Sequence, residues 1–453
     1  MIKVYGDGLD AVITINLLLK SGHEVSHYSK VDKFGGHFRG SQNCGGNFDL
    51  GMVLLEPDFI PTASVDLSDY KGEFGRHSRV FLKDVFEWLE GQVGNLIEQK
   101  VKTLLAPNQE IADYFIGDSL EFLNTLDNRQ KVELEARIIS LVEISSTRSE
   151  LHPAKKITSQ FAADTPLTDL LEEFYGEEIY QKYFQGFVLK VTGDSQPAIS
   201  ARDNRRIWLP NYYPESILFA LTQDLKYSNY ELKPLRFLRP EEGQIADFVL
   251  RLQEENNRNK SYQLVKIDKL PSESDLKESN SYYFLNISDF AKSDKHGFQF
   301  ATNYIKQIEN PVHTVSNSIN ITHFCVARCD PKTVFVAEET NEIIRYSYYS
   351  GQSGSAVSIE SIPGKVEPKT LSLQLMARDG LTAVCDGHSH QVPLRIRRTE
   401  FTLEEWNEFI NLVRVEYPTL NETFFLVHPE ANTFNDNLLR GLAAFRKREF
   451  RAS

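Results

Sequence analysis

The sequence predicts an α/β protein, and three observations support that class. Strand-like and helix-like patterns alternate around glycines within the first 30 residues, which is typical of a β-α-β unit. Residues 75–200 carry mostly helical periodicity, and β-rich segments recur after Pro210. We therefore expect parallel strands at the amino end, a helical insert and a separate β-rich part.

The composition fits a large globular protein that can bury a core. The chain has 453 residues, of which 41% are hydrophobic and 25% are charged. Domains contain roughly 100–200 residues, so this length predicts two or three domains or one large discontinuous one. The 50 Lys and Arg against 63 Asp and Glu leave a net charge of −13. This balance argues against general nucleic-acid binding, which needs a cationic surface for phosphates.

Cysteine content and hydropathy predict a reducing, aqueous compartment. Four cysteines in a chain of this length cannot form a disulfide framework. The first residues lack the cationic start and apolar stretch of a secretory signal. No run of about 18 apolar residues predicts a membrane span. We therefore expect a cytoplasmic protein without a membrane partner.

The first elements form a compact β-α-β unit. Residues 2–5 alternate as a short strand, and residues 11–20 form an apolar run that suits a helix buried on most sides. Gly22 ends this helix, because glycine adopts the left-handed cap at low cost. Residues 24–28 are then predicted to form a second strand.

A G-x-G-x-x-A motif, Gly6-Asp7-Gly8-Leu9-Asp10-Ala11, lies between the first strand and the helix. Gly6 would allow a tight turn, Gly8 would let the backbone reach a pyrophosphate, and the small Ala11 would permit close packing of helix on strand. The helix N-terminus offers N–H groups and the positive end of its dipole to phosphates. The motif predicts a Rossmann-like dinucleotide-binding domain.

The end of the second strand departs from that pattern. An acidic residue there normally binds the adenosine ribose hydroxyls, but this chain has Ser29 followed by Lys30. A serine can hydrogen-bond a hydroxyl without charge assistance. Lys30 could favour a phosphorylated ribose or could simply be solvated. A Rossmann-like fold that has lost its cofactor is the alternative interpretation.

Glycines crowd the next stretch of the chain. Six of them lie between positions 35 and 51: Gly35, Gly36, Gly40, Gly45, Gly46 and Gly51. Such density indicates a backbone that turns sharply or approaches something closely.

The remaining periodicities complete the α/β assignment. Helical patterns occur at residues 80–105, 114–126, 131–143, 167–190, 403–413 and 435–448. β-rich segments occur at residues 282–287, 319–326, 333–336 and 343–349.

The motif Phe34-Gly35-Gly36-His37-Phe38-Arg39, followed by Phe48-Asp49-Leu50-Gly51, resembles flavoproteins of the amine-oxidase and UDP-galactopyranose-mutase superfamily. The resemblance implies that FAD is the cofactor and that Gly35 and Gly36 pass near its pyrophosphate. It also implies that Arg39 pairs with the pyrophosphate and that Gly51 and Met52 border the isoalloxazine ring. His37 follows the double glycine and is assigned to the cofactor site, with a surface histidine as the alternative.

Two later passages extend the resemblance. Residues 205–213, which include Arg206 and Tyr213, look like the passage that lines the substrate cleft in the mutase-like group. Residues 433–441 resemble the closing helix, so Asn435, Asp436 and Asn437 would approach the flavin pyrimidine. A helix start there could stabilise negative charge on a reduced flavin. Where mutases place a tryptophan against uridine, this chain has Val191-Thr192, which puts UDP-sugar binding in doubt.

The resemblance implies a Rossmann-like FAD-binding domain that is discontinuous, with a helical insert and an antiparallel β-sheet substrate-binding part. We assign residues 1–70, 201–290 and 381–453 to the FAD-binding domain. Residues 75–200 form the helical insert and residues 291–380 the β-rich substrate part.

Four residues are candidates for substrate binding: Arg206, Tyr213, Arg345 and Tyr349. A guanidinium makes forked contacts with carboxylate or phosphate, and a structural ion pair is an equally weighted alternative for Arg206 and Arg345. Strand alternation would place Arg345 and Tyr349 on one face and Tyr346 and Tyr348 on the other. Sheet packing is the favoured interpretation of these tyrosines.

No metal site or hydrolase site is predicted. Cys325 and Cys329, with the segment from Cys385 to His390, match no common zinc spacing. No G-x-S-x-G elbow and no P-loop occurs in the sequence.

The favoured function is an FAD-dependent oxidoreductase-type enzyme acting on a small polar or anionic molecule. One alternative is a UDP-galactopyranose-mutase-like isomerase that uses reduced flavin on a nucleotide sugar. The other is a non-catalytic relative that has lost its flavin. The flavoenzyme interpretation requires that the protein's own atoms do not fill the space beside the first glycines, where the cofactor would bind.

Overall fold

The computed structural model describes most of the elements that surround the predicted site. The described residues are 1–43, 46–51, 53–55, 78–106, 109–111, 121–144, 165–193, 214–223, 237–268, 280–286, 312–337, 341–350, 355–398, 411, 415, 424–427 and 434–452. Among the predicted site residues, Met52, Arg206 and Tyr213 lie outside this set. The predicted helix at 403–413 also lies almost wholly outside it.

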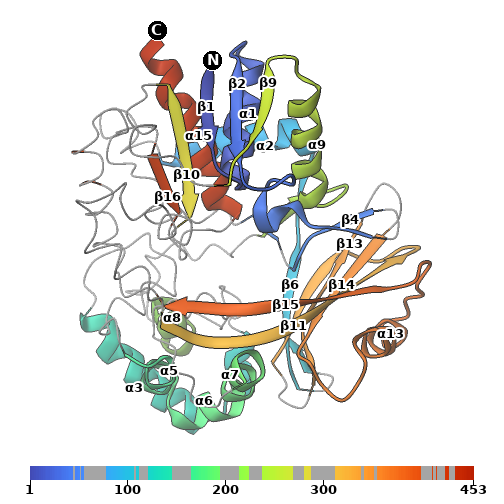
Figure 1. Cartoon of the computed structure of the whole chain (residues 1–453). Helices are drawn as coiled ribbons and strands as arrows, with labels where there is room; N and C mark the ends of the chain where they lie inside the picture. The colour runs from blue at the N-terminus through green and yellow to red at the C-terminus, as the bar shows by residue number, and fades with distance from the viewer. Residues whose placement is uncertain are drawn as a thin grey trace.

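Five parallel strands form the sheet at the top of Figure 1. Its order is β16 (Phe424–Val427), β10 (Ser281–Asn286), β1 (Ile2–Tyr5), β2 (Val25–Ser29) and β9 (Tyr262–Lys266). Counted along the chain, this is the 3-2-1-4-5 order of Rossmann-type sheets. The strands come from three separated parts of the sequence, so this part of the predicted fold is confirmed and is discontinuous.

Helix α1 (Leu9–Lys20) joins β1 to β2, as the motif predicts. Ten of its residues are buried, which agrees with its apolar composition. The helix ends where the amides of Ser21 and His23 bond to the Leu17 and Leu18 carbonyls, with Gly22 at a φ of +84°.

Helix α15 (Phe434–Ala452) crosses α1 at very close range. A Cβ on Gly441 would lie 2.9 Å from the Asp10 carbonyl oxygen and 2.9 Å from Ile13 Cβ. The Thr14 hydroxyl donates to the Gly441 carbonyl at 3.0 Å. This crossing brings the start of the last helix to the start of the first one.

Helices α9 (Ile245–Arg258) and α2 (Ser78–Val93) extend the packing around α1 and α15. A capping box begins α9, in which the Gln244 amide donates to the Asp247 carboxylate at 2.9 Å. Apolar residues of all four helices share one buried cluster with Phe34 and Phe38. The segment after β2 is therefore anchored to the helical layer.

A second, seven-stranded sheet occupies the lower right of Figure 1. Its order is β15 (His388–Arg398), β11 (Val312–Val326), β14 (Ser355–Ser361), β13 (Ile343–Tyr349), β12 (Lys332–Val336), β6 (Lys100–Ala106) and β7 (Gln109–Ile111). The prediction of an antiparallel sheet is correct except for β12 and β6, which pair in parallel. Strand β15 belongs to this sheet, although its residues were assigned to the FAD-binding domain.

The helix predicted at residues 80–105 is wrong in its second half. Helix α2 stops at Val93 because Gly94 adopts a φ of +83°. Strand β5 (Leu96–Glu98) follows and pairs with β8 (Leu238–Pro240), and β6 then enters the large sheet. In β6, Val101 and Thr103 are buried while Lys100 is exposed, which is the alternation of a strand.

The helical insert lies at the lower left of Figure 1 and confirms the helices predicted at 131–143 and 167–190. It contains α3 (Asn128–Ile144), α5 (Leu167–Tyr175), α6 (Glu177–Tyr183) and α7 (Gln185–Thr192). Helix α8 (Pro214–Thr222) packs with them on α3, although its residues were assigned to the FAD-binding domain. Residues 121–125 form a 3-10 turn inside the predicted helix at 114–126. The insert docks on the large sheet through Lys190, which donates to the Val336 and Ile343 carbonyls at 2.7 and 3.1 Å.

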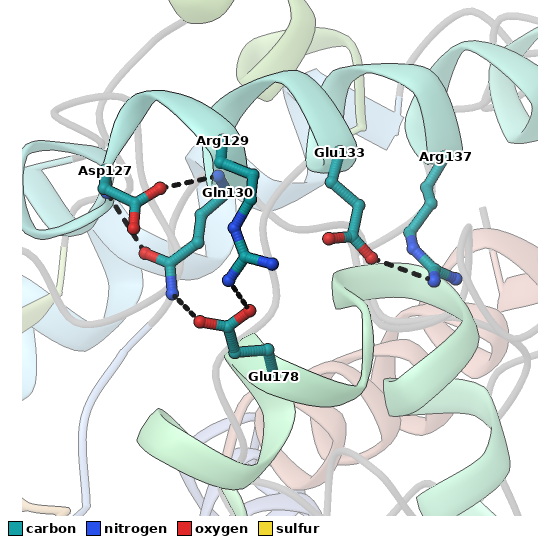
Figure 2. Close-up of polar contacts among 6 residues, drawn as sticks. All are labelled: Asp127, Arg129, Gln130, Glu133, Arg137 and Glu178. Atoms are coloured by element: carbon teal, nitrogen blue, oxygen red, sulfur yellow. Dashed lines mark hydrogen bonds and ion pairs between the residues drawn. The ribbon is translucent and has the colours of Figure 1, made fainter.

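A polar network caps α3 and ties it to α6 (Figure 2). The Gln130 amide donates to Asp127 at 2.8 Å, and the Asp127 amide donates back to Gln130 Oε1 at 3.1 Å. Gln130 and Arg129 both bind Glu178 on α6. The Arg129 and Glu178 side chains are 71% and 48% exposed, so this pair adds little to stability and the buried apolar cluster holds the insert together.

Among the helices that the structure describes, none is both long and apolar enough to cross a membrane.

Candidate cofactor site

The first glycine turn lies at the carboxyl edge of the parallel sheet, between β1 and α1. Gly6 has a φ of +143°, and a Cβ there would lie 2.5 Å from the Phe284 carbonyl oxygen of β10. The turn is therefore as tight as predicted, and its first glycine is required by close contact with the neighbouring strand. His27 holds the same turn by a 2.7 Å hydrogen bond to the Gly6 carbonyl.

The space beside Gly8 is taken by the protein's own Asp10. A Cβ on Gly8 would lie 2.4 Å from Asp10 Oδ1. That oxygen accepts a hydrogen bond from the Ala11 amide at 2.9 Å, and Oδ2 pairs with Arg440 Nε of α15 at 2.8 Å. The flavoenzyme interpretation requires open space beside the first glycines, and at Gly8 that requirement is met only in part. Ala11 is fully buried and packs toward the sheet, in agreement with its predicted role.

The start of α1 still offers hydrogen-bond donors to an anion. The first amide that bonds back within the helix is that of Val12, to the Gly8 carbonyl at 3.3 Å. The amides of Leu9 and Asp10 precede it and have no intrahelical acceptor. The charge of Asp10 is balanced by Arg440, since both side chains are almost fully buried against each other. A phosphate could bind these amides without meeting an unpaired carboxylate.

The second glycine turn begins the 3-10 helix η1 (Gly36–Arg39) and lies against the first. The Gly35 amide donates to the Asp7 carbonyl at 2.9 Å, and a Cβ on Gly35 would meet Val249 of α9 at 2.4 Å. Gly36 differs, because a Cβ there would meet no atom within 4 Å. Gly36 is exposed and has a φ of +56°, so its backbone is open to approach.

Ser29 ends β2 at the predicted position, but it has an acidic neighbour that was not predicted from the sequence. Its buried hydroxyl is hydrogen-bonded to the Asp7 carboxylate of the first turn. The same hydroxyl accepts from the Val31 amide at 3.0 Å. Lys30 is half-buried next to it. The signal that could have revealed Asp7 is an acidic side chain inside the glycine motif itself.

Arg39 is exposed and donates to the Lys33 carbonyl at 3.3 Å. Its guanidinium is therefore tied to the loop that follows β2. A pairing with the pyrophosphate stays a prediction.

The start of α15 reaches both glycine turns, whereas its predicted approach to a flavin pyrimidine stays a prediction. Asn437 Oδ1 lies 3.9 Å from the Cβ position of Gly8, and the Phe434 ring contacts Phe38 with centroids 5.5 Å apart. Asn435 and Asp436 lie in the same first turn of the helix; their side chains lie outside the described set.

His37 connects the second glycine turn to the Leu50 carbonyl. Burial of the ring lowers its pKa, and so does the charge of Arg345, although the residue as a whole is exposed. A hydrogen bond to the Leu50 carbonyl acts in the opposite direction. Because the net shift is downward, this imidazole is neutral at neutral pH.

Gly51 rests on a buried ion pair between β13 and β14. A Cβ on Gly51 would lie 3.3 Å from Glu360 Oε1 and 3.4 Å from Arg345 Nη2. Arg345 Nε donates to the same Glu360 oxygen at 2.9 Å, and both side chains are 3% exposed. The structure therefore shows the ion-pair alternative for Arg345 and not an arginine facing substrate.

Tyr349 is also buried rather than presented to a ligand. Burial and the nearby charge of Asp49 raise its pKa. On the opposite face of β13, the Tyr346 and Tyr348 rings pack 5.3 Å apart beneath α13 (Pro368–Arg378), where Tyr348 donates to Asp379 at 2.8 Å. The favoured interpretation of these tyrosines, sheet packing, is confirmed.

Asp49 is a second buried acid near the site. Its carboxylate accepts from the Ala246 amide at 2.7 Å and from the Ile245 amide at 3.4 Å, at the start of α9. Burial raises its pKa to about 7, although the two amides act in the opposite direction. Its contacts assign it a helix-capping role.

The histidines of β15 meet His323 of β11 without forming a recognisable metal centre. The His388 and His390 rings lie 4.2 Å apart, and His390 Nε2 lies 2.7 Å from the Ser41 hydroxyl. The Cys325 amide donates to Cys385 Sγ at 3.1 Å. Within the described part of the chain, no group of three or more His, Cys, Asp or Glu residues could hold a metal ion.

No protein-family model and no curated protein matches the sequence. Solved structures do match over the full length. A crystal structure of reduced UDP-galactopyranose mutase has a TM-score of 0.59 at 14% identity, covering 100% of this chain and 94% of that chain. An oxidoreductase from Methanosarcina mazei has a TM-score of 0.52 at 13% identity, covering 98% and 99%. Putrescine oxidase bound to putrescine has a TM-score of 0.52 at 10% identity, covering 100% and 98%.

At these identities the similarity establishes the fold and not the activity. The resemblance to the amine-oxidase and UDP-galactopyranose-mutase superfamily, predicted from the glycine motifs, is confirmed for the fold by matches to a mutase and to a putrescine oxidase.

Proposed function

We propose that this protein binds FAD at the carboxyl edge of its parallel sheet and uses it as a flavoenzyme. One observation carries the proposal: the two glycine turns and the start of α15 converge at that edge, and Gly36 borders open space there. Ligands of Rossmann-type sheets bind outside the carboxyl ends of the strands. The fold shared with the mutase, the oxidoreductase and putrescine oxidase supports the same location.

The residues at this edge fit the parts of a flavin dinucleotide. The amides of Leu9 and Asp10 with the open side of Gly36 would hold the pyrophosphate. Arg39 would approach it from the loop after β2. Gly51 would border the isoalloxazine, with His37 beside it. The flavin would supply the redox chemistry, and the protein would bind and orient cofactor and substrate.

The substrate in this proposal is a small polar or anionic molecule. His37 is the residue that we assign to proton transfer, because it follows the open Gly36, is exposed as a residue and carries a neutral imidazole. One ring nitrogen bonds to the Leu50 carbonyl, so the other is an acceptor in the neutral tautomer. We expect it to accept a proton from a substrate held beside Gly51. Arg206 and Tyr213 stay proposed substrate-binding residues. The cytoplasmic location also stays a proposal.

The visible spectrum of the purified full-length protein tests the cofactor assignment. We expect a flavin spectrum and release of FAD on denaturation. A colourless protein that gains no flavin absorbance when FAD is added would overturn the proposal. That result would favour the non-catalytic alternative, for which Asp10 beside Gly8 is the best structural support.

A mutase-type isomerase is the second candidate, and the fold match to reduced UDP-galactopyranose mutase supports it. Such an enzyme would turn over a nucleotide sugar only after reduction with dithionite. Turnover under that condition alone would establish this candidate. Inertness toward nucleotide sugars, with flavin reduction by another small molecule, would establish the oxidoreductase.

A further inference from the structure

We propose that Asp7, held against Ser29, is the acid that recognises the adenosine ribose in this chain and excludes a 2′-phosphate. This inference rests on the proposed binding of a flavin dinucleotide. It assigns a specificity role to a residue of the first glycine turn, in place of the missing acid at the end of β2.

Both sides of the Asp7–Ser29 contact are fixed by the fold. The Ile267 amide donates to the Ser29 carbonyl at 2.9 Å, which keeps the end of β2 in the sheet. The Asp7 carbonyl accepts from the Gly35 amide at 2.9 Å, which ties the first turn to the second. The half-buried Asp7 carboxylate is therefore positioned at the strand end rather than free in solvent.

The position of this carboxylate matches what a ribose site needs. A longer acidic side chain at position 29 would carry its carboxylate just beyond the place of the serine Oγ. Here the Asp7 carboxylate is hydrogen-bonded to that Oγ and so lies in the same space. A carboxylate accepts hydrogen bonds from a ribose diol more strongly than a neutral hydroxyl does. Ser29 thus positions the acid, and Asp7 supplies the charge.

The charge of Asp7 decides which ribose fits. A carboxylate attracts the 2′- and 3′-hydroxyls but repels a phosphate on the 2′ position. Lys30, half-buried beside Ser29, was the one feature that favoured a phosphorylated ribose. Asp7 is bonded directly to the side chain at the strand end, whereas Lys30 is one residue further along. We therefore expect an unphosphorylated adenosine ribose.

Calorimetric titration of full-length protein freed of bound nucleotide tests this assignment with FAD and with ADP. We expect Asp7→Asn to weaken the binding of both by about tenfold or more, because a charge-assisted hydrogen bond is lost. The wild type should prefer ADP to 2′-deoxy-ADP, and AMP to adenosine 2′,5′-bisphosphate, and Asp7→Asn should lose both preferences. The double change Asp7→Gly with Ser29→Glu returns the acid to the strand and should restore them. Asp32→Asn removes a nearby exposed carboxylate that pairs with Lys266, and it should leave binding unchanged.

The outcomes separate this inference from the proposed function. If the wild type and Asp7→Asn bind ADP with the same affinity, and bind FAD with the same affinity, the role of Asp7 is overturned and the flavin assignment stands. Binding of ADP that depends on Asp7, without binding of FAD, would overturn the flavin assignment and support Asp7. Binding of neither ligand by a folded wild type would overturn both.

Discussion

The two glycine turns at the edge of the parallel sheet look alike in sequence and differ in what surrounds them. In the first turn, Gly6 is pressed against the backbone of β10, and the space beside Gly8 holds the Asp10 carboxylate. In the second, Gly35 is likewise pressed against Val249 of α9, but Gly36 has no atom within 4 Å of its Cβ position. The first turn is thus shaped largely by contacts within the protein, and the second borders space that the described protein leaves open.

This difference shows that glycine density alone cannot distinguish two causes of a missing side chain. A glycine can be required because another part of the chain occupies the space, or because a ligand does. The first cause predicts a loss of stability on substitution, whereas the second predicts a loss of binding. Substitutions in and beside the two turns separate the two causes.

Gly6→Ala should have the largest effect on stability. The added Cβ would overlap the Phe284 carbonyl oxygen at 2.5 Å, and a φ of +143° strains any residue with a side chain. We expect the free energy of unfolding to fall by about 5 kcal/mol, as the sum of strain and overpacking. Urea denaturation measures it. Gly22→Ala is the matched control, since it also has a positive φ but no atom within 4 Å, and it should cost about 1–2 kcal/mol. Equal costs for the two variants would contradict the contact with β10.

Asp10→Asn should destabilise the protein by about 4 kcal/mol, because it removes the carboxylate that faces a buried arginine. Replacing both partners, Asp10→Leu with Arg440→Met, should recover most of that loss, since well-packed apolar side chains often substitute for a buried ion pair. Urea denaturation of the single and double variants is the measurement. A single variant as stable as the wild type would show that the pair does not hold α15 against the first turn.

Acid should weaken the first turn through His27. Burial lowers the pKa of this imidazole to about 4, although its hydrogen bond to Gly6 acts in the opposite direction. From pH 6.5 down to about 4, His27 binds a proton in the unfolded chain but stays neutral in the folded protein. The free energy of unfolding therefore falls as the pH falls. The loss attributable to His27 is about 3 kcal/mol at pH 4.

The difference between wild type and His27→Gln isolates this effect from other titrating groups. Unfolding free energies measured from pH 7 to pH 4 should fall more steeply for the wild type. His23→Gln, in the turn after α1, should leave the steep fall in place. Parallel curves for wild type and His27→Gln would contradict the assignment.

Gly36→Ala should have the smallest effect on stability and a clear effect on binding. A left-handed alanine costs about 1–2 kcal/mol and meets no neighbour here. Its methyl group would extend into the space assigned to the cofactor, so the FAD dissociation constant should rise by at least about tenfold. Titration calorimetry measures the affinity, and urea denaturation the stability. An unchanged affinity would remove Gly36 from the site.

Local pattern was sufficient for the elements nearest the site. The β1-α1-β2 unit, β10 and β13 lie where their alternation or apolar runs predicted them, because each is specified by neighbouring residues. Strand β6 was mistaken for helix, because its place depends on pairing with β12 more than 200 residues away. A short apolar stretch is compatible with the helical and with the strand periodicity, and pairing with a partner strand decides which structure forms.

The site itself depended on contacts that sequence spacing does not reveal. Asp10 meets Arg440 from the opposite end of the chain, and Arg345 meets Glu360 through the register of β13 on β14. Neither partner could be chosen from local sequence. Asp7 was visible inside the motif, but its role became apparent only when the turn brought it to Ser29.

Hydrogen exchange of the full-length protein, with and without saturating FAD, tests the central claim most directly. We predict slower amide exchange in the first turn of α1 and around Gly36, and unchanged exchange in α3 of the helical insert. Flavin that binds, as judged by its spectrum, without protecting either glycine turn would contradict the account.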